Sequence, residues 1–130
     1  MSALDWSQYP NFSKEKFDCK HTGKNEMVHE FMKLLQRLRD QYGKPMIVTS
    51  GYRDKTHPDE RKKKATGAHN LGMAVDIQVM GGEALELVGL AIQFGFTGVG
   101  VKQHGGSRFI HLDTIKATPS QPRPWLFSYK

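Results

Sequence analysis

The sequence has a single cysteine, Cys19, so the chain can form no internal disulfide, and one thiol without a second soft ligand is a poor start for a metal site. It also has no apolar run near the roughly 18 residues that a membrane-spanning helix needs, so we expect no membrane partner. Residues 1–17 lack the apolar stretch of a signal peptide, and we expect synthesis in the cytoplasm without an export signal.

What is present is typical of one folded domain spanning residues 1–130. Hydrophobic residues make up 38% of the chain and charged residues 25%, which predicts a single hydrophobic core and a monomer. The net charge of +6 favours polyanions in general. The densest basic run, residues 61–64, has no interleaved aromatic residues, so we expect a solvated loop and no nucleic-acid partner.

Local patterns predict a small α+β domain. Apolar residues at helical spacing predict one helix between Asn25, as its N-cap, and Gly43, and a second helix follows a Gly-Gly turn. Short apolar runs predict four strands, of which the last two form a hairpin. The predicted strands cover residues 46–49, 73–80, 99–101 and 109–112, and the second helix covers residues 83–94. Together they predict an antiparallel β-sheet with flanking helices.

Three segments carry weaker patterns. Residues 1–24 mix aromatic and polar side chains and predict an irregular arm packed on the domain. Residues 53–68 are polar and basic and predict a long surface loop that wraps the functional site. Residues 117–130 are rich in proline and aromatic residues, which predicts an extended tail docked on the domain.

Two segments place polar residues where burial is expected. Asp76 lies between two β-branched apolar residues, where an ionised carboxylate is costly unless it is paired or bound to a cation. His69 precedes it with a glycine between them, and His111 shares a strand face with Asp113. Two imidazoles and one carboxylate would leave a fourth tetrahedral position open on zinc. Spacing alone equally fits a salt-bridged aspartate beside ordinary histidines.

Three separated blocks carry a resemblance to a known superfamily. Residues 50–53 read Ser-Gly-Tyr-Arg, residues 69–76 follow the pattern H-x-x-G-x-A-x-D, and residues 109–113 follow F-x-H-x-D. In order and approximate spacing the chain resembles the zinc peptidases that include D-alanyl-D-alanine carboxypeptidases, phage L-alanyl-D-glutamate endopeptidases and the zinc-bearing signalling domain of hedgehog proteins. The resemblance covers roughly residues 12–127.

The resemblance implies that His69, Asp76 and His111 bind one zinc ion and that Arg53 projects beside the metal. An arginine there can bind a substrate carboxylate or stabilise an oxyanion. The implied substrate is the peptide stem of bacterial peptidoglycan, cut by a D,D-carboxypeptidase or an endopeptidase. With no export signal and no wall-binding repeat, we expect a phage-encoded enzyme, such as an endolysin released at lysis or a virion component.

The chain departs from the family pattern beside the last ligand. Many members carry a glutamate three residues before that histidine or a histidine two before it, as the general base, where this chain has Arg108 and Phe109. The remaining candidates for the base are Asp113 and His104, and Asp113 could instead orient an imidazole. This gap also leaves a second hypothesis, a zinc-containing wall-binding or structural module without catalysis.

Overall fold

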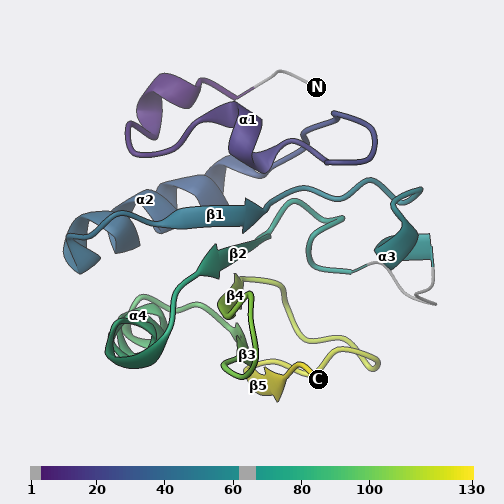
Figure 1. The fold of residues 1–130 in the computed structure, drawn as a ribbon. Coiled ribbons are helices and arrows are strands. Elements are labelled where there is room, and N and C mark those ends of the chain that lie inside the picture. Colours follow the sequence, from purple (N-terminus) through teal and green to yellow (C-terminus); the bar gives the residue numbers. More distant parts are fainter. Residues whose placement is uncertain (1–3, 62–66) are drawn as a thin grey trace.

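The computed structural model describes residues 4–61 and 67–130. A five-stranded sheet in the order β1-β2-β4-β3-β5 forms its centre (Figure 1). The strands are β1 (Ile47–Ser50), β2 (Ala74–Gln78), β3 (Gly98–Lys102), β4 (Phe109–Asp113) and β5 (Trp125–Ser128). The helices are α1 (Lys14–Phe17), α2 (His29–Tyr42), α3 (Pro58–Arg61) and α4 (Gly81–Gln93), with a short 3-10 turn, η1 (Trp6–Gln8). The predicted α+β class is confirmed.

The sheet is mixed and not wholly antiparallel as predicted. The pairs β1–β2, β2–β4 and β3–β4 are antiparallel, and β3–β4 is the predicted hairpin. The tail, however, crosses back and adds β5 parallel to β3. Residues 114–124 carry the chain from the end of β4 past the start of β3, since Asp113 and Trp125 both pair with Gly98 from opposite sides. A pairing between segments so far apart in the sequence leaves no signal in the local pattern of the strand.

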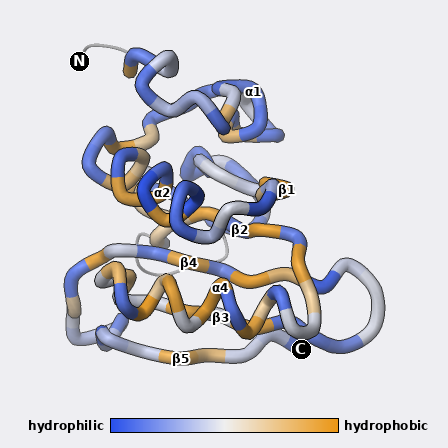
Figure 2. The backbone as a smooth tube through the Cα atoms, turned by 90° about the vertical axis from the view of Figure 1, so that its left-hand side faces the viewer, coloured by the Kyte–Doolittle hydropathy of each residue, from blue (hydrophilic) through white to orange (hydrophobic). Residues whose placement is uncertain are grey.

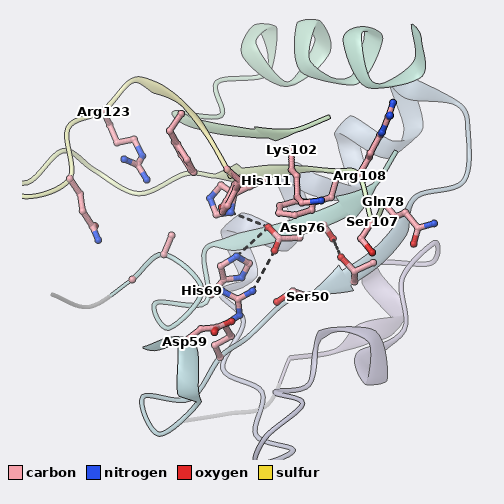
Figure 3. Close-up of a pocket in the computed structure, with 18 residues that line it drawn as sticks. Ser50, Asp59, His69, Asp76, Gln78, Lys102, Ser107, Arg108, His111 and Arg123 are labelled. Atoms are coloured by element: carbon pink, nitrogen blue, oxygen red, sulfur yellow. Dashed lines mark hydrogen bonds and ion pairs between the residues drawn. The ribbon is translucent and has the colours of Figure 1, made fainter. Parts of the chain in front are cut away.

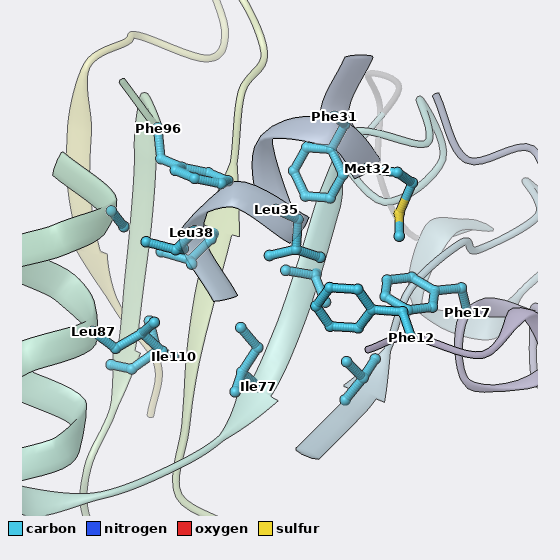
Figure 4. Packing of buried hydrophobic residues seen from close by; sticks show 14 of the residues in the cluster. Phe12, Phe17, Phe31, Met32, Leu35, Leu38, Ile77, Leu87, Phe96 and Ile110 are labelled. Carbon is cyan, nitrogen blue, oxygen red and sulfur yellow. The ribbon is translucent and has the colours of Figure 1, made fainter. Parts of the chain in front are cut away.

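Helices α2 and α4 cover one face of the sheet and enclose the main core (Figure 4). On β2 the alternation of side chains points Val75 and Ile77 into this core, so Asp76 points to the opposite face. In Figure 2 hydrophobic residues follow β2, β4 and one side of α4. The core therefore fixes which face of the sheet carries the polar residues.

Helix α2 starts later than predicted. It begins at His29, and its N-cap position is Val28, which makes no side-chain cap. Asn25 instead folds the preceding turn, since its Oδ1 accepts a hydrogen bond from the amide of Met27 at 3.1 Å. The helix ends as predicted at Gly43, whose φ of 72° suits glycine.

The segment that precedes α2 packs through aromatic side chains. Tyr9, Phe12 and Phe17 are buried against α2 and β1, and the amide of Asn11 donates to Gln36 on α2. Part of the predicted loop at 53–68 forms α3, whereas residues 62–66, and with them most of the basic run, lie outside the described residues. Within the described ranges, no helix is both long and apolar enough to cross a membrane.

Candidate metal centre

Two of the three predicted ligands face each other across the central strands. Asp76 on β2 and His111 on β4 are register partners, and both side chains point to the face away from α2 and α4. Nδ1 of His111 lies 3.1 Å from Oδ1 of Asp76, and both residues are buried. The pairing of these two strands alone thus assembles two ligands.

The third ligand, His69, comes from the turn that leads into β2. Gly72 allows this turn because its φ is 73° and because a Cβ there would collide with the carbonyl oxygen of Glu26. The turn brings Nε2 of His69 to 3.3 Å from Oδ1 of Asp76. Nδ1 of the same ring contacts the carbonyl oxygen of Gly51 at 2.7 Å.

The outer nitrogen of each imidazole meets an atom that can only accept a hydrogen bond. The outer nitrogen of His69 faces the Gly51 carbonyl, and Nε2 of His111 lies 2.7 Å from Oδ2 of the Asp113 carboxylate, so each outer nitrogen carries the proton. The inner nitrogens are then directed at Asp76. Within the described part of the chain, Nε2 of His69 is buried with no hydrogen-bond partner.

These three side chains fit a cation. One ligand atom from each of His69, Asp76 and His111 lies within 4.8 Å of the others, and all three residues are buried. A buried nitrogen with no partner is costly, and a metal ion would satisfy it together with the facing carboxylate oxygen. The structure therefore brings the predicted ligand set together (Figure 3).

The electrostatics of the three groups agree with this fit. Burial lowers the pKa of His69, which keeps that ring neutral and able to ligate. Burial opposes ionisation of Asp76, but its contacts with His69 and His111 still hold its pKa below the ordinary value. Burial also disfavours the charged form of His111, yet hydrogen bonds to Asp113 and Asp76 raise its pKa. The Asp76 carboxylate thus favours a positive charge between itself and the two imidazoles, which a metal ion would supply.

Arg53 lies at the other oxygen of Asp76. Its Nη2 is 3.5 Å from Oδ2 of Asp76, and its Nη1 is 4.0 Å from Oε2 of Glu60. The amide of Arg53 donates to the carbonyl oxygen of His69, which ties the Ser-Gly-Tyr-Arg turn to the ligand turn. Tyr52 points away, with its hydroxyl donating to Glu26, and burial raises its pKa to about 12.

The two candidates for the base lie in different surroundings. Asp113 is fully buried, and both of its oxygens are engaged, by His111 and by the guanidinium of Arg123. His104 is exposed in the turn between β3 and β4, with Nε2 3.2 Å from the carbonyl oxygen of Tyr129. Among the described residues that line the cleft at the ligands, neither Asp113 nor His104 occurs.

The ligands open into a cleft of about 710 Å³. Its walls include several residues that the sequence analysis did not single out: Asp59 from α3, Lys102 from β3, and Arg123, Phe127 and Tyr129 from the tail. The alternating aromatic residues at 125, 127 and 129 could have indicated a strand face. No pattern in the sequence marked Arg123 or Asp59.

Tyr129 forms part of an aromatic wall beside the ligands. Its ring lies 4.9 Å from that of Phe109, centre to centre, and the ring of Phe127 lies 5.2 Å from that of His111. Burial, followed by the charge of Asp76, raises the pKa of Tyr129, so its hydroxyl keeps its proton at neutral pH. It can therefore donate a hydrogen bond in the cleft but cannot serve as a base there.

A buried carboxylate and two imidazoles at the wall of an open cleft could hold a metal ion and leave room for a further ligand, the arrangement of metal-dependent hydrolases. The family model for Peptidase M15 matches residues 9–113, so the chain belongs to this family, whose members are metal-dependent peptidases. The match confirms the resemblance carried by the three sequence blocks. Comparisons with curated proteins and with solved structures find no match.

Proposed function

We propose that this chain is a zinc-dependent peptidase that hydrolyses an amide bond in the peptide part of bacterial peptidoglycan. The observation that carries the proposal is the convergence of His69, Asp76 and His111 within 4.8 Å beside a cleft, in a chain of the Peptidase M15 family. Two imidazoles and one carboxylate are a ligand set typical of catalytic zinc. When bound, zinc would supply Lewis-acid activation of water and of the substrate carbonyl.

The protein's own groups would divide the remaining work. Arg53 lies at Oδ2 of Asp76 and is one-fifth exposed, so its guanidinium can stabilise the negative charge that develops on the attacked carbonyl oxygen. Tyr129, held protonated, can donate a second hydrogen bond to the substrate from the part of the cleft wall that the tail forms. Asp113 orients His111, which is the second of the two roles that the sequence left open for it.

We assign the role of proton acceptor to Asp59. It is the cleft-lining carboxylate, other than Asp76, among the residues that the structure describes. It is exposed at α3 and is drawn below His69 in the view of Figure 3. Asp113 is less suited because Arg123 and His111 already occupy its oxygens, and His104 because it does not line the cleft.

The charge of the cleft supports an anionic substrate. The cationic side chains Arg53, Lys102 and Arg108 line it against the two carboxylates Asp59 and Asp76, and the charge of Arg123, also at the wall, is paired with Asp113. Stem peptides of peptidoglycan carry free carboxylates, which arginine and lysine bind by charge-assisted hydrogen bonds. This agreement supports the substrate class but does not separate a carboxypeptidase from an endopeptidase. The resemblance to small phage enzymes supports a role at lysis or on a virion.

One observation favours the rival hypothesis, a zinc module without catalysis. The positions where relatives carry the base hold Arg108, whose Nε donates to the carbonyl oxygen of Gly105, and Phe109, whose ring faces Tyr129. Neither side chain can accept a proton at neutral pH. Turnover by the purified protein decides between the two hypotheses.

The test is incubation of the zinc-loaded protein with purified muropeptides, followed by mass spectrometry. Loss of a terminal alanine would identify a carboxypeptidase, and a cut within the stem or cross-link would identify an endopeptidase. The metal-stripped protein is the control and should leave the muropeptides intact, with activity restored by added zinc. Intact muropeptides with zinc-loaded protein across a range of pH would overturn the enzymatic proposal and favour the zinc module.

A further inference from the structure

The segment after Asp113 lies beyond the residues that the family model matches, yet it supplies part of the cleft wall. Arg123, Phe127 and Tyr129 all come from this segment, and β5 pairs with β3 at the edge of the sheet. Residues 114–130 thus lie where they can contact the proposed metal ligands, which come from the matched region.

Arg123 binds the carboxylate of Asp113 through two parallel hydrogen bonds. Its Nε donates to Oδ1 at 3.0 Å and its Nη2 donates to Oδ2 at 2.8 Å. The third nitrogen, Nη1, donates to the carbonyl oxygen of Pro122 at 2.8 Å. Since all three nitrogens already bind protein atoms, the guanidinium is engaged with the protein and is not directed at a substrate.

The Asp113 carboxylate has little freedom to move. It is 0% exposed, and it lies against the backbone of β3 at Gly98, where a Cβ would collide with both of its oxygens. A buried carboxylate in such a space needs a cationic partner, and Arg123, one-tenth exposed, is that partner. The ring of Phe127 stacks near the guanidinium, 5.7 Å from its central carbon.

Asp113 in turn holds the imidazole of His111. Its Oδ2 lies 2.7 Å from Nε2 of His111, so the proton of the ring stays on Nε2 and Nδ1 faces Asp76 and His69. A carboxylate that fixes the tautomer and the orientation of a ligating histidine also strengthens it as a ligand. The contacts therefore run without a break from Arg123 through Asp113 to His111.

We infer that Arg123 is a positioning residue of the metal centre: it fixes Asp113, which presents Nδ1 of His111 to the metal. The inference rests on the proposed metal site and deepens it, because it makes a residue outside the matched region a determinant of zinc affinity. The competing explanation is that Arg123 only fastens the tail to the sheet.

The experiment measures zinc affinity by competition with a chelator and, separately, the visible spectrum of the cobalt(II)-substituted protein. Arg123→Gln removes the charge and one arm of the contact, and we expect it to weaken zinc binding about 10- to 100-fold and to shift the cobalt spectrum. Arg123→Lys keeps the charge without the two-pronged geometry and should recover part of the affinity. Lys116→Gln removes one charge from an exposed position of the same segment and should match the wild type.

A double-variant cycle tests whether Arg123 acts through Asp113. We expect Arg123→Gln combined with Asp113→Asn to bind zinc no more weakly than the more affected single variant, since both changes break one chain of contacts. Additive losses would show that Arg123 acts by another route and would overturn the inference.

Wild-type zinc affinity and an unchanged cobalt spectrum in folded Arg123→Gln and Arg123→Lys would show that Arg123 only fastens the tail. If Arg123→Gln does not fold, the comparison of Arg123→Lys with Lys116→Gln decides on the same readouts. A wild-type protein that binds no zinc would instead overturn the proposed function. A wild type that binds zinc and cleaves muropeptides, with unaffected Arg123 variants, would overturn this inference alone.

Discussion

The two imidazoles of the metal centre are held by different means. On one side, which we call the main-chain side, Nδ1 of His69 contacts the carbonyl oxygen of Gly51. The turn that carries His69 is fixed by main-chain hydrogen bonds from Arg53 to His69 and from Val28 to Gly72. On the other, the side-chain side, His111 depends on Asp113 and Arg123. A main-chain anchor is set by the fold itself, whereas a side-chain anchor can be adjusted by single substitutions that leave the fold intact.

Asp76 joins the two sides, so its removal should have the largest effect. Asp76→Ala deletes the oxygen that faces both imidazoles and leaves two ligands, too few to retain zinc. We expect the zinc content after gel filtration to fall from one ion per chain to near zero, with loss of turnover. Glu15→Ala, at an exposed position, is the control. Tight binding of one zinc by Asp76→Ala would show that the ligand set is wrong.

The next test compares two candidate proton acceptors, Asp59 in the cleft lining and His104 outside it. Asp59→Asn should retain zinc and lower kcat by a factor on the order of 10² to 10⁴, the usual contribution of a general base. His104→Ala should leave both zinc content and kcat near wild-type values, because the ring is exposed and outside the cleft lining. The reverse pattern, with His104→Ala slow and Asp59→Asn unaffected, would transfer the role to His104.

Asp113→Asn weakens the contacts that hold His111 and leaves those that hold His69 unchanged. The amide has nearly the same size but loses the charge that holds the proton on Nε2 of His111, so we expect zinc affinity to fall about 10- to 100-fold. At saturating zinc much of the turnover should return. A variant that binds zinc as tightly as the wild type yet has no turnover would show that Asp113 is the general base.

Gly72→Ala disturbs the turn that holds His69 and leaves the contacts of His111 unchanged. The new Cβ would meet the carbonyl oxygen of Glu26 at a positive φ, so we expect the free energy of unfolding to fall by about 1–3 kcal/mol in urea denaturation. Gly89→Ala is the matched control, since it lies in α4 with open space around its Cβ and should be neutral or stabilise by about 0.5–1 kcal/mol. Equal stability of the two variants would show that the turn at Gly72 can relax.

The residues of the metal centre also differ in how far they could be predicted from the sequence. Asp76 could be singled out because a charge stood in a segment otherwise suited to burial, and the family resemblance carried by the three blocks then supplied the set with His69 and His111. These signals are local, as is the strand pattern that places ligands on β2 and β4. Helices α2 and α4 and strands β1 to β4 followed from the same local periodicity, with shifts of a few residues at their ends, whereas α1, α3 and β5 were not predicted.

Arg123 had no such signal. The role that we infer for it depends on the pairing of β5 with β3, a contact between distant parts of the chain that a local pattern does not encode. The tail was predicted only to dock, and its proline residues gave no indication of a parallel strand. The prediction of Asn25 as N-cap was wrong for a different, local reason: its side chain accepts a hydrogen bond from the amide of Met27 in the turn before the helix.

The position of β5 in the chain also has a consequence for biosynthesis. A ribosome adds the residues of β1 to β4 first, and with them all three ligands, whereas Arg123 and the strand that carries it follow later. During this interval the nascent chain holds the carboxylate of Asp113 without its cationic partner. If Arg123 positions the proposed metal site as inferred above, that site is complete only once the tail has paired with β3, so full metal affinity would be reached late in synthesis.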